Sequence, residues 1–411
     1  MKVLQINCVY KKGSTGKITA DVHSKLMEQG IESIVCYGRG EVIRDDHVYK
    51  TCPEWYAKLN KVRSMLDGVM YSGCCFSTNK LIRIIRREKP DVVHLQCING
   101  YFVNIYRLLR WLKENHIKTV LTLHAEFMYT GGCGHAFDCT QWNTPEGCGR
   151  PKCPRYRAET KSIVFDRTST MWRRMKAAFD GFDDDLIVTS VSPWLMQRAK
   201  QSPILCDKRH VVVYNGLNTR VFHPYETDEE KKRLGIANQK IVIHVTAAFS
   251  TAPDHIKGGR YVIEAANRMK DEDVIFLVFG PHEEGISVTP NVRLLGRIAD
   301  QALLAKYYSM ADVTLLTSKK ETFSMVTAES LCCGTPVVGF KAGAPEQITI
   351  PEYSRFVDYG DMNGLLDGIH CFLSQPKDEK MPEKAAIKYS TETMAQGYLN
   401  CYKQLLNEQV R

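Results

Sequence analysis

The sequence lacks the long apolar segments that membrane-spanning proteins carry. None of its apolar runs reaches the about 18 residues that a transmembrane helix needs, so we expect no such helix. The opening stretch MKVLQINCVY is too short for a secretion signal, and residues 11–17 directly after it are too polar, so it is typical of a first β-strand. We therefore expect a cytoplasmic protein.

Internal repeats and low-complexity segments are also missing. A chain of 411 residues with 44% hydrophobic and 25% charged residues has the composition of a globular protein with two domains. Short apolar runs such as 240–245 and 274–279 alternate with amphipathic segments of helical period. This alternation predicts the α/β class, with a doubly wound parallel sheet in each half of the chain.

Cysteine is plentiful, with fifteen residues, but most of them are scattered, and without a secretion signal we expect reduced thiols. One group is an exception, because four cysteines lie within a Gly- and Pro-rich insertion at 131–156. Their spacings differ from the C-x2-C of zinc ribbons. A structural zinc site, disulfides and unliganded thiols all remain open for Cys133, Cys139, Cys148 and Cys153.

Charge is divided unevenly along the chain. Residues 1–223 hold 34 Lys and Arg against 21 Asp and Glu, whereas the remainder holds 21 against 25. A basic first half predicts an anionic partner such as membrane phospholipid, a lipid-linked pyrophosphate or nucleic acid. Basic helices expected at 79–89 and 102–113, the second with Tyr106 and Trp111, could lie on an anionic bilayer or simply expose a solvated face.

The most informative stretch begins with an apolar run at 311–316, which predicts a buried parallel strand. Glu321 follows where the chain leaves the carboxyl end of that strand, the place where open α/β sheets bind ligands. A helix start at Ser324, Met325 and Val326 offers backbone N–H groups to an anion. Glu329 lies about one and a half turns further on. The two carboxylates could flank a phosphate, or they could belong to an ordinary solvated helix start.

This stretch resembles the donor-binding signature of family 4 glycosyltransferases. The resemblance rests on two Glu residues separated by seven positions, then CGTPVV at 333–338 and AGAPE at 342–346. It implies the GT-B fold, with two Rossmann-like domains facing across a cleft. It also implies a retaining, metal-independent hexosyltransferase with no cofactor for catalysis. Such an enzyme moves a sugar from a nucleotide diphosphate sugar to a saccharide or lipid-linked saccharide in cell-surface polysaccharide synthesis, and can sit on the cytoplasmic face of the membrane.

On this basis we expect an acceptor-side domain at 1–223, which contains the Cys-rich insertion, and a nucleotide-sugar domain at 224–381. Helices at 382–411 would pack back on the first domain. The basic, Gly-containing turn at 10–17 fails as a Walker A loop, because Lys11 and Ile18 stand where that motif needs Gly and Ser or Thr. The resemblance makes it a contact for donor phosphate, through Gly13, Ser14, Thr15 and Gly16.

The resemblance also implies roles for single residues. Glu329 would hold the ribose, Glu321 the hydroxyls of the transferred sugar, and Lys257 the diphosphate. His124, which ends an apolar run at 119–123, would face the sugar. The nucleobase would lie against Gly296 and Arg297.

Two departures from the family pattern stand out. Relatives pair the lysine with an arginine a few residues earlier, but residues 247–252 contain none, so Arg260 and Lys319 are candidate substitutes. Many relatives place Asp after the histidine, whereas Ala125 and Glu126 follow here.

Three other functions remain to be weighed. A non-catalytic GT-B scaffold would agree with the missing arginine. A nucleotide-sugar epimerase or a phosphorylase would share the fold, although the paired Glu signature is less typical of it. A zinc-dependent nucleic-acid-binding protein would use the cysteines and the basic half, but it leaves both the Glu pair and the two βα domains unexplained, so we expect no nucleic-acid partner.

Overall fold

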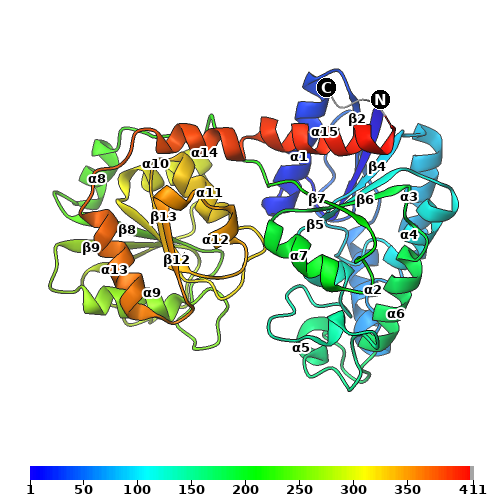
Figure 1. The fold of residues 1–411 in the computed structure, drawn as a ribbon, viewed down its shortest axis with the longest axis horizontal. Helices are drawn as coiled ribbons and strands as arrows, with labels where there is room; N and C mark the ends of the chain where they lie inside the picture. Colours follow the sequence, from blue (N-terminus) through cyan, green and yellow to red (C-terminus); the bar gives the residue numbers. More distant parts are fainter. Residues whose placement is uncertain (408–411) are drawn as a thin grey trace. The chain divides into compact units, whose positions relative to one another are not determined.

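The computed structural model describes residues 1–407, which divide into two compact units (Figure 1). Unit 1 contains Met1–Tyr214 and the C-terminal residues from Met394, and unit 2 contains Asn215–Thr393. The predicted boundary after residue 223 therefore lies nine residues beyond the one observed. Physically, the chain joins unit 2 early because the Leu217 N–H donates to the Tyr389 carbonyl at 2.8 Å.

The sheet of unit 1 is entirely parallel, with strand order β3-β2-β1-β4-β5-β6-β7. Its central strands are buried along almost their whole length, as expected for a parallel sheet with helices on both faces. The order reverses between β1 and β4, so their carboxyl ends frame a switch point. The strands are β1 (Lys2–Asn7), β2 (Glu32–Tyr37), β3 (Val48–Lys50), β4 (Val92–Leu95), β5 (Thr119–Leu123), β6 (Leu186–Ser190) and β7 (Arg209–Val212).

Two helices from opposite ends of the chain share one core of unit 1. Ile18, Val22 and Leu26 of the first helix pack in one cluster with Tyr398 and Tyr402 of the last. Residues 394–407 are thus held by unit 1, as Figure 1 shows for α15. The helical elements of this unit are α1 (Gly13–Glu28), α2 (Glu54–Asp67), α3 (Cys75–Glu88), α4 (Ile105–Glu114), η1 (Glu126–Met128), η2 (Gln141–Asn143), α5 (Tyr156–Thr160), α6 (Thr168–Phe179), α7 (Pro193–Gln201) and α15 (Thr391–Leu405).

The tail predicted as one helical unit is split between the two units. The helix before α15 belongs to unit 2, where it packs on α11, so the prediction that the whole tail from residue 382 joins the first domain differs from the observed division. The break falls at Ser390, whose backbone is extended (φ −64°, ψ 153°). The last residues of the predicted tail, 408–411, lie outside the described residues.

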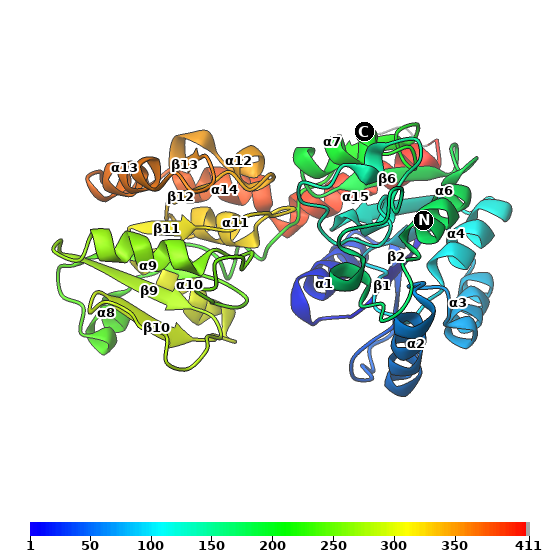
Figure 2. The same ribbon diagram turned by 90° about the horizontal axis from the view of Figure 1, so that it is seen from below.

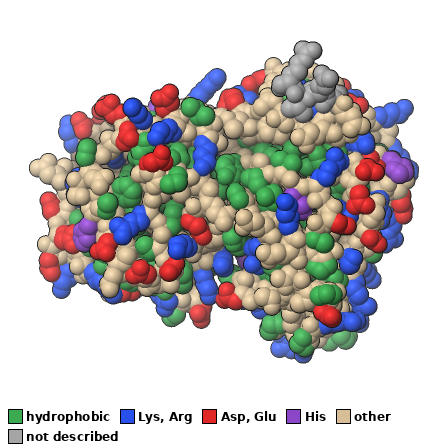
Figure 3. All heavy atoms as spheres, in the orientation of Figure 1, with side chains coloured by type: hydrophobic (Ala, Val, Ile, Leu, Met, Phe, Trp, Pro, Cys, Tyr) green, Lys and Arg blue, Asp and Glu red, His purple; other side chains and the backbone are tan. Residues whose placement is uncertain are grey.

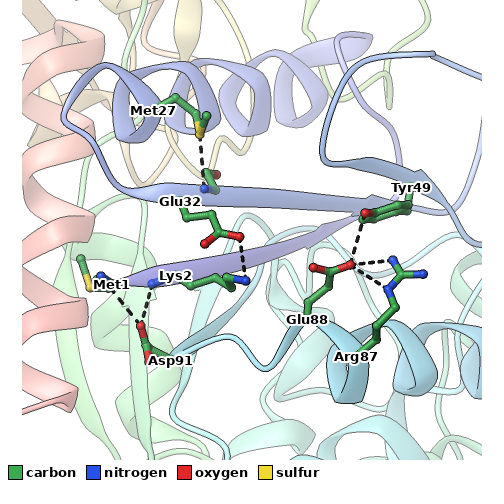
Figure 4. A network of polar contacts seen from close by, with 9 residues as sticks. Met1, Lys2, Met27, Glu32, Tyr49, Arg87, Glu88 and Asp91 are labelled. Carbon is green, nitrogen blue, oxygen red and sulfur yellow. Dashed lines mark hydrogen bonds and ion pairs between the residues drawn. The ribbon is translucent and has the colours of Figure 1, made fainter.

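Ion pairs close the amino-terminal edge of the first sheet (Figure 4). The Lys2 side chain pairs with Glu32 at 2.7 Å, and the Lys2 backbone N–H donates to Asp91 at 2.6 Å. Glu88 accepts from Tyr49 and pairs with Arg87. Exposed pairs of this kind contribute at most about 1 kcal/mol each, so this edge is well solvated and ordinary.

Unit 2 repeats the doubly wound pattern with strand order β10-β9-β8-β11-β12-β13. The order reverses between β8 and β11, and the core on one face is filled by α9 and α13 (Figure 2). The elements are α8 (Asp228–Leu234), β8 (Lys240–Val245), α9 (Gly259–Arg268), β9 (Val274–Phe279), β10 (Val292–Gly296), α10 (Gln301–Met310), β11 (Val313–Leu316), α11 (Met325–Cys332), β12 (Val337–Phe340), α12 (Pro345–Ile348), η3 (Pro351–Tyr353), β13 (Ser354–Val357), α13 (Met362–Leu373) and α14 (Met381–Tyr389).

The predicted fold class, two doubly wound parallel sheets, is confirmed. No helix among residues 1–407 has the length and apolar character needed to cross a bilayer. On α4, which corresponds to the basic helix expected at 102–113, Tyr106 is 6% exposed, and the Arg86 guanidinium lies over the Trp111 ring, 5.5 Å from its centre. On α3, which corresponds to the other basic helix, Phe76 is 76% exposed. Tyr106 is therefore excluded from any membrane contact, and bilayer association of these two helices stays a prediction.

Candidate functional site

The carboxyl edge of the sheet in unit 2 brings Lys257 and Glu321 together. Lys257 lies in the loop from β8 to α9, Glu321 follows β11, and the Lys257 Nζ is 2.6 Å from the Glu321 Oε1. The side chains are 28% and 18% exposed, so the pair is reachable from solvent. The switch point of the sheet therefore carries one accessible cation and one accessible anion.

The loop that carries Lys257 is fixed by its neighbour from β11. The Thr317 hydroxyl donates to the Lys257 carbonyl at 2.9 Å, and the Lys319 N–H donates to the Ile256 carbonyl at 2.8 Å. Gly258 has a φ of +62°, and a Cβ there would lie 2.2 Å from the Thr317 carbonyl oxygen. Only glycine allows this approach, so the position of the lysine is built into the backbone.

Glu321 is supported by the second half of the sequence motif. Its N–H donates to the Ala342 carbonyl at 2.9 Å, and Glu346 accepts from the N–H groups of Ala342 and Gly343 at 3.0 and 2.9 Å. The AGAPE segment thus holds the loop beside Glu321 in place, and Glu346 has a structural part that the sequence analysis did not assign.

Ser324 caps α11 in a strained conformation. Its φ of 87° is unusual for a residue with a side chain, and its hydroxyl accepts from the Thr327 N–H at 3.3 Å. Such strain costs about 1–3 kcal/mol and is concentrated at ligand-binding sites. The N–H groups of Met325 and Val326 form the first turn of α11, where the helix dipole favours an anion.

Glu329 is oriented by a buried tyrosine. The Tyr308 hydroxyl of α10 donates to the Glu329 Oε2 at 3.1 Å. Burial, together with the Glu329 charge, raises the pKa of Tyr308 well above its ordinary value, so this hydroxyl stays a donor. Glu329 therefore holds its carboxylate in a fixed direction along α11.

A cavity of about 270 Å³ opens at the carboxyl ends of β8, β9 and β10. Val245, Phe279 and Gly280 line it from the strands, and Arg297 with Ile298 line it from the loop after β10. The predicted nucleobase residue Arg297 thus borders a real cavity, and Gly296 directly precedes it with a φ of +70°.

The structure separates the two candidates for the missing arginine. The Arg260 guanidinium lies 4.5 Å from the Tyr261 ring centre and donates to the Tyr261 hydroxyl at 2.7 Å, so it is already engaged. Lys319 is exposed, and its backbone is bonded to the residue before Lys257. Lys319 is the better placed of the two.

In unit 1 the predicted residues also lie at a carboxyl edge. Gly13, Ser14, Thr15 and Gly16 form the first turn of α1 after β1, and His124 follows β5. The His124 Nε2 lies 2.9 Å from the Gln96 Oε1, and Gln96 follows β4. Burial lowers the pKa of His124 to about 4, so the ring is neutral near pH 7 and donates to the amide oxygen.

A buried polar chain continues behind His124. The Gln96 amide reaches the His94 Nδ1 at 3.5 Å, and that nitrogen also bonds the Tyr402 hydroxyl of α15 at 2.7 Å. The other His94 nitrogen bonds the Thr122 hydroxyl at 2.7 Å. Burial lowers the pKa of His94 to about 3, so this chain carries no charge.

Glu126, whose role the sequence left in doubt, is an anchor. It is 1% exposed, pairs with Arg198 of α7 at 2.6 Å, and accepts from the Ala136 N–H at 2.6 Å and the Tyr129 hydroxyl at 3.0 Å. All of these partners tie the start of the Cys-rich insertion to α7. The carboxylate faces the protein and offers nothing to a ligand.

The Cys-rich insertion is held by aromatic packing, although its sequence is rich in Gly and Pro. Trp142 is 1% exposed, and Gly147 lies against the Trp172 ring, where a Cβ would come within 2.3 Å. The four cysteines are free, and burial raises the pKa of Cys148 to about 12. Within residues 1–407 no three His, Cys, Asp or Glu side chains are grouped to hold a metal ion, so the predicted zinc site gains no support.

Comparison with known proteins identifies the domain that carries this site. Residues 240–375 match the family model described as glycosyl transferases group 1. The chain carries a group 1 glycosyltransferase domain. The matched segment begins at the first strand of unit 2 and includes Lys257, Arg297, Glu321 and Glu329, so the resemblance to family 4 glycosyltransferases is confirmed.

Relatives that match almost the whole chain are also glycosyltransferases or synthases by name. The chain is 26% identical to the N-acetyl-alpha-D-glucosaminyl L-malate synthase of Bacillus anthracis, over 98% of this chain and 97% of the relative. It is 20% identical to the putative colanic acid biosynthesis glycosyl transferase WcaC of Escherichia coli K12, over 98% and 100%. The solved structure of Anabaena Alr3699/HepE in complex with UDP has a TM-score of 0.64 and 17% identity, over 98% of this chain and 100% of that one. These structural neighbours confirm the GT-B fold.

The sequence analysis missed some residues that contact the candidate site residues. Gln96 follows a buried strand just as His124 does, so the strand-end rule could have found it. Tyr308 and Thr317 carried no signal, because their contacts with Glu329 and Lys257 depend on how α10 and β11 pack.

Proposed function

We propose that the protein is a retaining hexosyltransferase that moves a sugar from a nucleotide diphosphate sugar to a saccharide or lipid-linked saccharide without a catalytic metal. The observation that supports this proposal most strongly is the Lys257–Glu321 ion pair near the start of α11. A bound donor can exchange with that pair: its diphosphate takes the ammonium and the helix N-terminus, and its sugar hydroxyls take the carboxylate.

Each part of the donor has a matching group in unit 2. The charge that develops on the leaving diphosphate is met by Lys257, by Lys319 and by the N–H groups at Ser324–Val326, an electrostatic contribution that is already in position. Glu329, oriented by Tyr308, accepts from the ribose hydroxyls. The nucleobase occupies the cavity beside Gly296 and Arg297.

His124 and the first turn of α1 in unit 1 take part in transfer under this proposal. A neutral imidazole suits a group that bonds sugar hydroxyls, since it adds no charge. One relative is named for colanic acid biosynthesis, which supports a saccharide acceptor. The Anabaena protein was solved in complex with UDP, which supports a nucleotide diphosphate sugar as donor. Cell-surface polysaccharide synthesis is therefore the role that we propose, with UDP-sugars as the first donors to test.

Thermal unfolding with UDP-, GDP- and ADP-sugars tests the donor site. A donor present at 100 times its dissociation constant stabilises the folded state by about 2.7 kcal/mol. We expect one class of nucleotide to raise the melting temperature of the native protein and to have no effect on Glu321→Ala with Glu329→Ala. Stabilisation by none of the three classes would contradict the proposal.

A non-catalytic scaffold is the second candidate, and one observation favours it: Arg260 is engaged with Tyr261 and does not supply the missing arginine. A scaffold would bind donor without turning it over. Release of free nucleotide from the stabilising donor, measured with and without a saccharide acceptor, separates the two functions.

A further inference from the structure

Helix α2 of unit 1 exposes its large apolar side chains to solvent and buries its small and polar ones. Its buried positions are Ala57, Asn60 and Ser64, all small or polar. Its large apolar side chains instead face solvent, with exposed fractions of 67%, 57%, 53% and 56% for Trp55, Leu59, Val62 and Leu66. Spacings of four, three and four residues place them within about 60° of one another on the helix. They form one continuous apolar stripe.

The buried side of α2 shows that this orientation is fixed. The Asn60 side chain donates to the Tyr56 carbonyl at 2.7 Å and accepts from the Cys74 N–H at 2.8 Å. Gly73 packs so closely that a Cβ there would lie 2.2 Å from the Asn60 Oδ1. Turning the helix to bury its stripe would break these contacts, so the apolar face stays outward.

Further exposed apolar residues lie at both ends of the stripe. Phe76 is 76% exposed, and its ring is 5.7 Å from that of Tyr56 near the start of α2. At the other end the Ile163 N–H donates to the Met65 carbonyl, which places Ile163–Phe165 against the end of α2. We call this surface the α2 patch; it consists of Trp55, Leu59, Val62, Leu66, Phe76 and 163–165. Most of the large exposed apolar residues of the described chain belong to it.

The charges around the α2 patch are basic. Lys58 and Lys61, both exposed, flank the stripe on one side, and Arg63, exposed on the other side, is paired with Asp67 at 3.3 Å. Lys161 and Arg167 lie beside 163–165, with Arg167 over the Phe165 ring at 5.3 Å. The acidic residues of α2 are already paired, Glu54 with Arg39 and Asp67 with Arg63. Figure 2 shows α2 projecting from its unit. Figure 3 shows the face seen in Figure 1, with hydrophobic side chains beside Lys and Arg where α5 lies, and not the face that carries α2.

We propose that the α2 patch docks on an anionic lipid bilayer, with the apolar stripe in the headgroup region and the flanking lysines on lipid phosphates. An exposed apolar face with Trp and Phe and a basic border is the pattern of helices that lie in a bilayer interface. The basic border decides the occupant, since an apolar protein partner needs no ring of positive charge. This inference extends the proposed function by naming the membrane surface of the enzyme.

Sedimentation with lipid vesicles tests the docking directly. The full chain should bind vesicles that contain phosphatidylglycerol, bind far less to pure phosphatidylcholine, and be released by salt. Leu59→Ser with Leu66→Ser should abolish binding, and Lys58→Gln should weaken it about fivefold. The matched control is Ile387→Ser, which removes a 69% exposed apolar residue of α14 and should leave binding unchanged.

Two further measurements keep the outcomes apart. Trp55 should shift its emission to the blue on vesicles and be quenched by brominated lipid, and Trp55→Phe should remove that response. Binding that survives the Leu59/Leu66 variant would overturn the proposal, and so would a dimer that this variant dissolves. Transfer to a soluble acceptor is measured separately and should be unchanged in the same variant, so docking and the proposed function can fail independently.

Discussion

Two ion pairs of the same length lie at the carboxyl edges of the two sheets, and they differ in how far they are buried. Glu126 and Arg198 in unit 1 are 2.6 Å apart, as are Lys257 and Glu321 in unit 2. Glu126 is 1% exposed and already accepts from Ala136 and Tyr129, whereas both members of the second pair reach solvent. A carboxylate at the end of a strand is therefore not a ligand-binding group by its position alone. We expect it to bind a ligand only where it is accessible and its oxygens are not already saturated by protein donors.

The largest effect that we expect on the difference between the two ion pairs comes from Glu126→Gln. This change leaves the Arg198 charge in a largely buried site without its partner, and breaking such a pair costs about 3–5 kcal/mol. We expect the free energy of unfolding of unit 1 to fall by that amount. All five tryptophans lie between residues 55 and 194, so tryptophan fluorescence during denaturant unfolding reports on unit 1 alone.

The control for this variant is Glu264→Gln, which removes an exposed partner of Arg268 in unit 2. An exposed pair contributes less than about 1 kcal/mol, so the unfolding of both units should hardly change. A similar loss of stability in the two variants would show that Glu126 is no more than a surface residue.

For the ion pair of unit 2 we expect a larger effect on the transfer rate than on stability. Lys257→Met removes a cation from an accessible pair, so we expect a change in stability below about 1 kcal/mol. Its loss at the leaving diphosphate should lower the transfer rate about 100- to 1,000-fold. Steady-state transfer assays and circular dichroism of the same preparations measure both quantities.

Lys240→Met is the matched variant at the opposite edge of the same sheet. Lys240 starts β8 and pairs with Asp312 at 3.1 Å. We expect its transfer rate to stay within about twofold of the native one. If both lysine variants lost activity to the same degree, the carboxyl edge of unit 2 would have no special part in transfer.

The loops that carry Glu126 and Glu321 also show how much of a site can be predicted from sequence. Lys257, Glu321, Ser324 and Glu329 could be placed because a local motif fixes a strand end, a loop and a helix start in order. The part played by Glu126 could not, since its partners come from α7 and from the far side of the insertion. The local pattern predicts the candidate site of unit 2, whereas tertiary packing decides the structural part that Glu126 plays in unit 1.

Helix α2 is a second case in which the sequence could not decide. Its apolar residues recur at the spacing of an ordinary core-facing stripe, so the pattern by itself predicts burial. Only the hydrogen bonds of Asn60, which fix the other side of the helix inward, reveal that the stripe faces out. For α4 the error was the reverse, because Tyr106 looks interfacial in sequence and is buried in the fold.

Acid should weaken unit 1 more than unit 2, where burial lowers the pKa of one histidine, His244, to about 4. Burial lowers the pKa of His94 to about 3 and of His124 to about 4, both in unit 1. In the unfolded chain these histidines bind protons below about pH 6.5, whereas in the folded unit they stay neutral until their lowered pKa values are reached. The stability of unit 1 should therefore fall as the pH drops from about 6.5 to about 4.

The expected loss at pH 5 is about 2 kcal/mol for each histidine. Denaturant unfolding followed by tryptophan fluorescence at pH 7, 6 and 5 measures it. In His124→Asn the loss of stability between pH 7 and pH 5 should be smaller by the contribution of one histidine, about 2 kcal/mol. A stability of unit 1 that does not change across this range would mean that the rings are protonated in the folded state.

The smallest effect in this series concerns the contact by which α15 joins unit 1. Tyr402→Phe removes the hydroxyl that bonds the His94 Nδ1 at 2.7 Å and leaves that buried nitrogen with the longer 3.5 Å contact to Gln96. An unsatisfied buried polar group costs about 1–3 kcal/mol, so the fluorescence-detected unfolding of unit 1 should shift by that amount. Tyr49→Phe, which removes a less buried hydroxyl bonded to Glu88 at 3.2 Å, should cost less. Equal shifts would mean that the polar chain from His124 to α15 adds no stability of its own, and that the C-terminal helix is held by apolar packing alone.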